Sequence, residues 1–347
     1  MMKLTRTCSA IVTLAALSLA TSCDSEGSDS STSRSEKPLI GVDVPRTDSD
    51  FWNSYGQFLR KRADSGEFNT LPIGNSFNDS ANMVDNIRVF TNVGAKAIVM
   101  APQDTAAVDP VLKRLATAGI PVVTVDTRPD NGKVYMVVRG DNRAYGTKAC
   151  LFLGKQLGGQ GKVAELQGDL HSVNGRDRSE GFATCMKDEF PNIKVYELPT
   201  DWKGDVASSR LQRLLAQHPD LNGIYMQSGG VFLYPTLQLL RKKGLLKTVG
   251  QEGHIHIVSN DGDPQEFDAI RRGEIDATVS QPADLYAKYA LYYAQAAGEG
   301  KTFEPGRTDH GSTIIKLPGG LEDQLPAPLV TRENVDDSAL WANTLPE

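Results

Sequence analysis

The sequence predicts an α/β fold made of two doubly wound, parallel-sheet lobes. From residue 38 onward, short apolar strands alternate with helical segments, which is the order that gives parallel sheets with helices on both faces. Many strands of this kind are expected, and a single sheet approaching roughly ten strands tends to split in two. The chain of 347 residues is also long enough to bury two cores.

The N-terminus is expected to be an export signal. Lys3 and Arg6 precede an apolar segment of small residues over 10–20, so residues 1–22 are predicted to be a signal peptide. The signal ends in Leu-Ala-Thr-Ser-Cys, which is similar to a bacterial lipobox although its Leu lies one position early. Cys23 would then be the lipidated first residue, and the alternative is an ordinary signal peptide with an incidental cysteine. Residues 23–37 are rich in Ser, Asp and Glu and are expected to form a flexible, lipid-anchored linker.

The charge balance argues against several partners. The sequence has 37 Lys and Arg against 43 Asp and Glu, a net charge of −6, and contains no basic block. Nucleic acid and anionic membrane surfaces are therefore not expected to bind. After the N-terminus no run reaches the roughly 18 apolar residues of a membrane span. Contact with the membrane is expected only through the lipid anchor, at the outer face of the bacterial cytoplasmic membrane.

Two of the four cysteines remain in the predicted mature chain. Cys8 leaves with the signal and Cys23 would be lipidated, which leaves Cys150 and Cys185. Each lies in a helical pattern beside the strand expected at 163, so contact between them is geometrically possible. An oxidising compartment would allow a disulfide, and two buried free thiols are the alternative.

The expected elements follow one another in regular order. A further helix is expected to start near 176–180, after an Asn-Gly turn at 174–175. The expected strands are 39–44, 95–100, 121–125, 133–138, 163–167, 223–226, 255–259 and 276–279. The expected helices are 51–65, one ending at 118, 145–158, 205–217, 231–243 and 264–272.

Polar and aromatic residues gather where these strands end. Parallel α/β sheets place their ligand crevice outside the carboxyl ends of the strands, so these residues are candidates for one site. Arg176 would offer a fork of N–H donors to a polar ligand. Each candidate could instead be a helix cap or a turn residue. Aromatic faces pack on apolar C–H surfaces while Asp, Arg, Gln and Ser bond hydroxyls, so the set predicts a neutral polyhydroxyl ligand. The candidates are Asp50, Phe51, Trp52, Gln103, Asp126, Thr127, Arg128, Arg176, Trp202, Ser228, Asp261 and Gln281.

The same residues carry a resemblance to a known family. From 39 to 316 the chain resembles the ribose-type periplasmic sugar-binding proteins of bacterial ABC importers, which have the type I solute-binding fold. The residues that match the family motifs are Asp50-Phe51-Trp52, Ala101-Pro102-Gln103-Asp104, Asp126, Arg176 in Arg-Asp-Arg-Ser-Glu-Gly-Phe, Trp202, Asp261 in an Asp-Gly pair, and Gln281 in Ala-Thr-Val-Ser-Gln.

Some positions depart from the ribose pattern. Thr127 stands where ribose binders have Arg, and Arg128 comes one residue later. Gln-Ser-Gly at 227–229 replaces Gln-Asn-Asp, and Ser49 stands at an Asn position. The resemblance therefore implies a pentose, a hexose, a deoxysugar or a sugar alcohol rather than ribose specifically.

The resemblance also implies an architecture and a role. Three hinge crossings are expected near 140–142, 281–282 and 310–313. The N-terminal lobe would be 38–140 plus 283–310, and the C-terminal lobe with its tail 141–282 plus 311–347. A monomer would close on its ligand and deliver it to an ABC permease with a cytoplasmic ATPase, without any cofactor. The alternative is a sensor subunit that presents a carbohydrate or autoinducer-like ligand to a membrane receptor.

Other functions find less support in the sequence. The His-x-His pair at 254–256 resembles a metal pair, but its alternation with Ile255 and Ile257 is typical of a strand entry, so no metal is expected. A carbohydrate hydrolase using Asp126 and Asp261 lacks any nucleophile signature, and no enzymatic activity is expected. A sugar-responsive repressor would need DNA-binding helices in place of the export signal.

Overall fold

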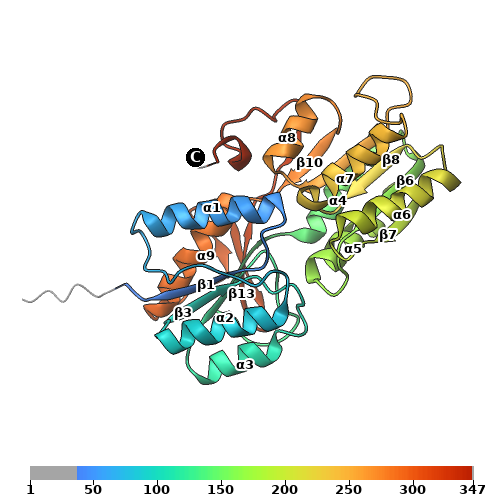
Figure 1. The fold of residues 1–347 in the computed structure, drawn as a ribbon. Coiled ribbons are helices and arrows are strands. Elements are labelled where there is room, and N and C mark those ends of the chain that lie inside the picture. Colours follow the sequence, from blue (N-terminus) through green and yellow to red (C-terminus); the bar gives the residue numbers. More distant parts are fainter. Residues whose placement is uncertain (1–36, 346–347) are drawn as a thin grey trace, which may run out of the picture. The chain divides into compact units, whose positions relative to one another are not determined.

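The computed structural model describes residues 37–345, which form two parallel-dominated sheets with helices on both faces (Figure 1). The expected signal peptide, most of the expected linker and Cys23 lie outside these residues. Within 37–345, no helix is both long and apolar enough to cross a membrane.

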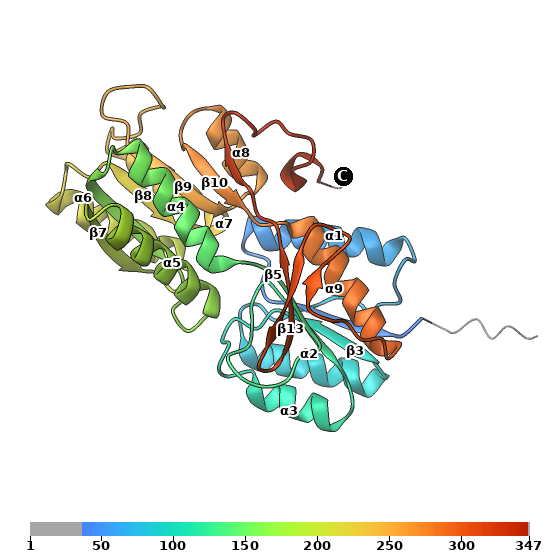
Figure 2. The same cartoon turned by 180° about the vertical axis from the view of Figure 1, so that it is seen from behind.

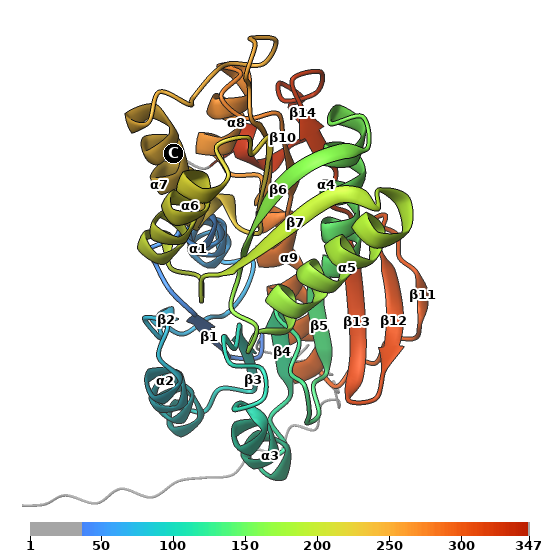
Figure 3. The ribbon, with the colours of Figure 1, turned by 90° about the vertical axis from the view of Figure 1, so that its right-hand side faces the viewer.

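The first sheet has eight strands among the described residues, in the order β11-β12-β13-β5-β4-β3-β1-β2. The strands from β13 to β2 are parallel to one another, whereas β12 and β11 are antiparallel additions (Figure 3). Its strands are β1 (Ile40–Val44), β2 (Gly74–Asn75), β3 (Ala97–Met100), β4 (Val122–Val125), β5 (Met136–Gly140), β11 (Gly306–Arg307), β12 (Thr313–Leu317) and β13 (Gly320–Leu325).

Two pairs of helices cover this sheet. The buried side of α1 (Asp50–Asp64) packs with α9 (Ala283–Gly298) over Val42, Val99 and Val123 (Figure 2). On the other face, α2 (Ser80–Val93) and α3 (Asp109–Thr117) pack over Ile98 and Met100. Successive residues of a strand point to opposite faces, so each central strand contributes side chains to the apolar cores on both faces of the sheet.

The second sheet has the order β14-β10-β9-β8-β6-β7, and only β14 is antiparallel within this described set. Its strands are β6 (Gln160–Gln167), β7 (Asn192–Pro199), β8 (Gly223–Met226), β9 (His256–Asp261), β10 (Ala277–Ser280) and β14 (Leu329–Thr331). One face carries α4 (Asn142–Gln156) and α5 (Val173–Glu189), and the other carries α6 (Gly204–Gln217), α7 (Gly229–Lys242) and α8 (Pro264–Arg271).

The chain passes between the sheets three times in the described region. It leaves β5 for α4 at 140–142, and it leaves β10 for α9 at 280–283. The third passage lies at 326–328, between β13 and β14, rather than at the expected 310–313. A hairpin turn at 318–319 folds β13 back on β12, and β13 then pairs in parallel with β5. Residues 311–325 therefore belong to the first sheet, in contrast to the expected boundary.

The start of α5 also differs from the expectation. Ser172 is the N-cap, and its hydroxyl accepts a hydrogen bond from the Asn174 amide at 3.3 Å. The predicted Asn-Gly turn at 174–175 is wrong, because these residues form the first helical turn. Helix α5 therefore begins three residues before the expected Arg176.

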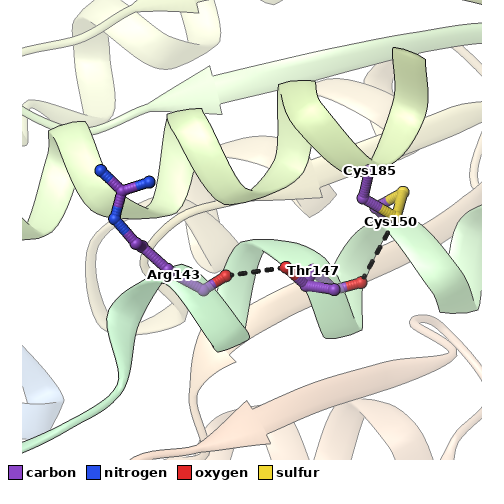
Figure 4. The surroundings of a disulfide bond; sticks show 4 residues. All are labelled: Arg143, Thr147, Cys150 and Cys185. Atoms are coloured by element: carbon purple, nitrogen blue, oxygen red, sulfur yellow. Dashed lines mark hydrogen bonds between the residues drawn. A yellow bond between two sulfur atoms is a disulfide. The ribbon is translucent and has the colours of Figure 1, made fainter. Parts of the chain in front are cut away.

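A disulfide between Cys150 and Cys185 joins α4 to α5 (Figure 4). The two helices approach closely because glycines face the partner backbone. A Cβ atom on Gly146 would lie 2.1 Å from the Arg178 carbonyl oxygen, and one on Gly181 would lie 2.2 Å from that of Arg143. Only residues without a side chain allow this contact.

Candidate ligand-binding site between the two sheets

A cavity lies where the carboxyl ends of the two sheets face each other. Its wall comes from the loops after β1, β3 and β4 on one side and after β6, β7, β8, β9 and β10 on the other. This is the edge at which open parallel sheets place ligands. The cavity is small, about 40 Å³. The lining residues are Arg46, Ser49, Phe51, Trp52, Gln103, Asp126, Thr127, Ser172, Asn174, Arg178, Trp202, Ser228, Val231, Asp261 and Gln281.

Aromatic rings line both sides of the cavity. Phe51 and Trp52 lie in the first turn of α1 and meet edge to face, with ring centroids 5.3 Å apart. From the second sheet, Trp202 stacks on Phe232 at 6.2 Å. Gly168 makes room for this indole, because a Cβ atom there would lie 2.0 Å from the Trp202 ring. The rings provide apolar faces against which the C–H groups of a ligand can pack.

Arg178 is the more deeply buried of the two arginines that line the cavity, with 2% of its surface exposed against 7% for Arg46. Its Nε donates to Asn142 Oδ1 at 2.7 Å, and its Nη1 donates to the Gln227 carbonyl at 2.5 Å. The guanidinium carbon lies 5.7 Å from the centre of the Trp202 ring. Nη2 bonds no residue that the structure describes, so it remains a donor for a ligand.

Asp126 supplies the matching acceptor. Its backbone is left-handed, with φ of 63°, and its Oδ2 accepts from Asn174 Nδ2 at 2.8 Å. Its Oδ1 is buried and has no hydrogen-bond partner within 37–345. Burial raises the pKa of Asp126 to about 6, although the charges of Arg178 and Arg139 oppose the rise. An unpaired buried acceptor costs about 1–3 kcal/mol, which a ligand hydroxyl would relieve.

Asp261 holds its neighbours in place. Its Oδ1 accepts from Gln281 Nε2 at 2.7 Å, and its Oδ2 accepts from the Ser228 hydroxyl at 2.6 Å and the Gly230 amide at 2.9 Å. Burial raises its pKa, and the nearby Arg178 partly opposes this. The carboxylate therefore orients two other lining residues of the second sheet.

Contacts between the sheets surround the cavity. Asn174, at the start of α5, bonds Asp126 through its amide nitrogen, while its amide oxygen accepts from Arg139 Nη2 at 3.0 Å. Arg139 Nη2 also donates to Asp177 Oδ2 at 3.0 Å. The two halves of the site are thus bonded to each other in the described arrangement.

Nine of the twelve predicted ligand residues line the cavity, and three do not. Arg176 instead pairs with Asp130 and donates to the carbonyls of Leu170 and His171. Residues two apart on a helix differ by about 200° in direction, so Arg178 faces the cavity when Arg176 faces away.

The other two predicted residues also have different neighbours. Asp50 is the first residue of α1 and lines a separate surface cavity with Gly229 and Tyr234. Arg128 lies 3.6 Å from Glu322 Oε2 and 4.0 Å from Asp177 Oδ2, outside the cavity wall.

Six lining residues were not among the candidates. The Arg-x-Arg motif contained Arg178, and helix periodicity would have separated it from Arg176 if the start of α5 had been placed correctly. Arg46 could not be predicted from the sequence, because it lies in an irregular loop between β1 and α1 where no periodicity sets the direction of a side chain. Its Nη2 donates to Asp48 Oδ2 at 2.9 Å. The six residues are Arg46, Ser49, Ser172, Asn174, Arg178 and Val231.

Similarity to known proteins covers most of the described chain. The family described as periplasmic binding protein domain matches residues 40–302. The chain is 26% identical over 298 residues to the ribose import binding protein RbsB of Bacillus subtilis, covering 84% of this chain and 93% of that relative. It is 25% identical over 261 residues to the xylitol-binding protein of Mycolicibacterium smegmatis, covering 75% and 68%.

A solved structure is also similar over most of the chain. An ABC transporter solute-binding protein from Mycobacterium smegmatis with bound glycerol has a TM-score of 0.74 and 25% identity to this chain. The match covers 86% of this chain and 95% of that one.

Proposed function

Because this chain belongs to the periplasmic binding protein domain family, we propose that it captures a small sugar or sugar alcohol between its two lobes and delivers it to an ABC transporter permease. The family implies export to the periplasm or the cell exterior. Lipidation at Cys23 would hold the protein at the outer face of the cytoplasmic membrane, as the lipobox-like sequence predicts.

One observation carries this proposal. The cavity presents an unpaired acceptor, Asp126 Oδ1, and an available donor, Arg178 Nη2, between aromatic rings from both sheets. A polyol has hydroxyls that both donate and accept, on a carbon chain with apolar C–H faces. Its chemistry therefore matches the polar groups and the rings at the same time.

The charges and the size of the cavity narrow the ligand class. Arg46 is already paired with Asp48, and Arg178 faces two carboxylates, Asp126 and Asp261. No surplus positive charge is left for an anion such as a sugar phosphate. The cavity is small and is walled by side chains from both sheets, which argues against an oligosaccharide. Relatives named for ribose and xylitol, and a neighbour with bound glycerol, fall within this class.

Import is favoured over sensing. The relative from Bacillus subtilis is named as an import binding protein, and the solved neighbour is described as an ABC transporter solute-binding protein. These relatives are binding proteins, which agrees with the expectation that the chain has no enzymatic activity.

The test is a ligand panel read out by thermal unfolding and titration calorimetry. The panel contains pentoses, hexoses, deoxysugars and polyols, including ribose, xylitol and glycerol. A ligand at 100 times its Kd stabilises the folded state by about 2.7 kcal/mol. For a protein of this size, the melting temperature should rise by roughly 2 °C or more.

A matched pair of variants links binding to the cavity. Asp126→Asn should abolish the ligand-induced shift, because the amide replaces the unpaired carboxylate oxygen. Asp43→Asn alters another buried carboxylate, which bonds Asn86 at 2.7 Å outside the cavity, and should leave the shift intact. Silence across the panel, or undiminished binding by Asp126→Asn, would refute the proposal.

A further inference from the structure

Two histidines and an aspartate meet at the amino-terminal ends of β9 and β10, opposite the strand ends that line the cavity. His254 precedes β9, His256 is the first residue of β9, and Asp276 directly precedes β10. Because β9 and β10 are parallel neighbours, their amino ends lie side by side. Asp261 ends β9 and Gln281 follows β10, so the cavity residues lie at the other end of the same two strands.

The spacing of the three side chains suits a metal ion. His254 Nε2 lies 2.9 Å from Asp276 Oδ2, and His256 Nδ1 lies 2.9 Å from Asp276 Oδ1. One ligand atom from each of the three side chains lies within 4.8 Å of the others. Ligands bound about 2.0–2.1 Å from a tetrahedral ion are about 3.3 Å from one another. Small side-chain adjustments would thus bring these three around one ion.

Surrounding hydrogen bonds orient the two most buried ligands. His254 Nδ1 lies 2.8 Å from the Lys247 carbonyl, which can only accept, so Nδ1 carries the hydrogen. Nε2 is then the nitrogen turned to the carboxylate. The Ile257 amide donates to Asp276 Oδ2 at 2.7 Å. Metal-binding histidines and carboxylates are typically held by such outer hydrogen bonds.

The contact between His254 and Asp276 places a ring nitrogen 2.9 Å from a carboxylate oxygen. A neutral imidazole with hydrogen on Nδ1 presents a lone pair at Nε2, which would face the lone pairs of the carboxylate. Either a second proton or a metal ion makes this contact favourable. His256 Nδ1 lies 2.9 Å from the other oxygen of the same carboxylate, so each oxygen of Asp276 faces a histidine ring nitrogen.

The site is both enclosed and accessible. The side chains of His254 and Asp276 are 5% and 6% exposed, whereas that of His256 is 24% exposed. One side is therefore open for entry of an ion and for a water molecule as fourth ligand. Three protein ligands with one open position form a recognised zinc arrangement.

We propose that His254, His256 and Asp276 bind one divalent transition-metal ion of the zinc class. Imidazole and carboxylate ligands suit zinc and its first-row neighbours rather than calcium or magnesium. The ion would link the amino-terminal ends of β9 and β10. Asp261 lies at the carboxyl end of β9, and Gln281 directly follows the carboxyl end of β10. This site is independent of the sugar-binding proposal.

The first test uses the exported protein without a histidine tag, stripped of metal by a chelator. Titration calorimetry with zinc chloride should show one strong site per chain. Cobalt(II) at the same site should give the visible absorption bands of a four-coordinate ion, which the hydrated ion lacks. A chain that takes up neither zinc nor cobalt overturns the proposal.

Variants distinguish this site from other metal ligands of the chain. His256→Gln removes the most exposed of the three ligands, so the fold should survive. Zinc affinity should fall by more than about 100-fold, beyond the 10–100-fold typical of outer-shell changes. His254→Gln should have the same effect. His171→Gln alters an exposed histidine elsewhere and should bind zinc as the unmodified chain does. Equal zinc affinity in His256→Gln and the unmodified chain would overturn the assignment.

Discussion

Arg178 is the cavity cation on which ligand affinity should depend. Arg178→Lys keeps the charge but removes the fork that now bonds Asn142 and the Gln227 carbonyl. Loss of a buried, charged hydrogen-bonding partner costs about 2–5 kcal/mol, so the Kd of the ligand found in the panel should rise by about 30-fold or more. Titration calorimetry measures the change.

Arg176→Lys is the matched control for this prediction. Its side chain bonds loop carbonyls and Asp130 outside the cavity, so the Kd should change by less than about threefold. If the two variants bound equally well, or if Arg176→Lys were the weaker binder, Arg178 would not be the ligand donor.

For these two arginines, the sequence predicted the motif but not which side chain faces the cavity. The motif Arg-Asp-Arg was located from the sequence, and the crevice at the strand ends was expected. Which arginine faces the crevice depends on where α5 begins, since each residue adds about 100° of rotation. Ser172 caps the helix three residues earlier than expected, and that shift decides between the two side chains.

Glu165 should make stability depend on pH. It lies on β6, where its Oε1 accepts from Gln227 Nε2 at 2.8 Å, and burial raises its pKa from 4.5 to about 8. The folded state thus binds this proton more tightly than the unfolded chain does. The stabilisation is full below pH 4.5 and is lost as pH rises to 8, by about 2 kcal/mol between pH 6 and 8.

Glu165→Gln isolates this contribution, because glutamine has a similar size and no titrating proton. Urea unfolding at pH 6 and at pH 8 should show a smaller loss of stability in the variant than in the unmodified chain. Comparing the two proteins cancels contributions from other groups that titrate in this range, such as Asp43, whose pKa is raised by burial to about 6. Equal losses would mean that Glu165 does not carry the effect.

Among the helices, α4 and α5 should depend on their disulfide. The bond between Cys150 and Cys185 closes a loop across a separation of 35 residues. Restricting the unfolded chain over that length stabilises the fold by about 4 kcal/mol in the loop-entropy model. A Cys150→Ser/Cys185→Ser double variant should therefore lose up to that amount in urea unfolding.

Reductant provides the control for the disulfide. Added reductant should lower the stability of the unmodified chain towards that of the double variant and leave the variant itself unchanged. A variant as stable as the oxidised chain would contradict the prediction, and so would an unmodified chain that responds to reductant no more than the variant does.

Most central elements could be predicted because their apolar periodicity is local. The strands expected at 121–125 and 223–226 match β4 and β8 to within one residue. The hairpin of β12 and β13 was missed, because its strands mix Lys, Glu, Asp and Gln with apolar residues. The hairpin joins the first sheet because β13 pairs with β5, which is far away in the sequence, and a local sequence pattern cannot predict such long-range pairing.

At the scale of the whole molecule, the sequence predicted two lobes but not how the C-terminal tail connects them. Neighbouring residues of the tail join different cores: Leu340 packs with the second-sheet helices, and Trp341 packs with the first. The Trp341 ring lies 6.2 Å from that of Phe51, which also lines the cavity. In α8, Arg271 donates to Asp336 at 2.8 Å and to Asn343 at 2.8 Å.

The tail should therefore resist separation of the lobes. Hinge opening would carry α1 away from α8, so the tail must lose its contacts with one of them. Arg271→Ala removes the hydrogen bonds from α8 to Asp336, Val335 and Asn343 of the tail, while Leu340 and Trp341 keep their apolar contacts. Since Arg271 is partly exposed, the effect should be at most about 1 kcal/mol, or a roughly fivefold shift towards open forms. Small-angle X-ray scattering of the ligand-free protein should show a larger radius of gyration.

Arg241→Ala is the matched control, because Arg241 makes an exposed pair with Glu274 at 2.9 Å and does not bond the tail. Its radius of gyration should equal that of the unmodified chain. Saturating ligand should return Arg271→Ala to the same closed dimensions, since ligand binding favours the closed form in every variant. An Arg271→Ala protein that scatters like Arg241→Ala without ligand would show that the tail follows the lobes without restraining them.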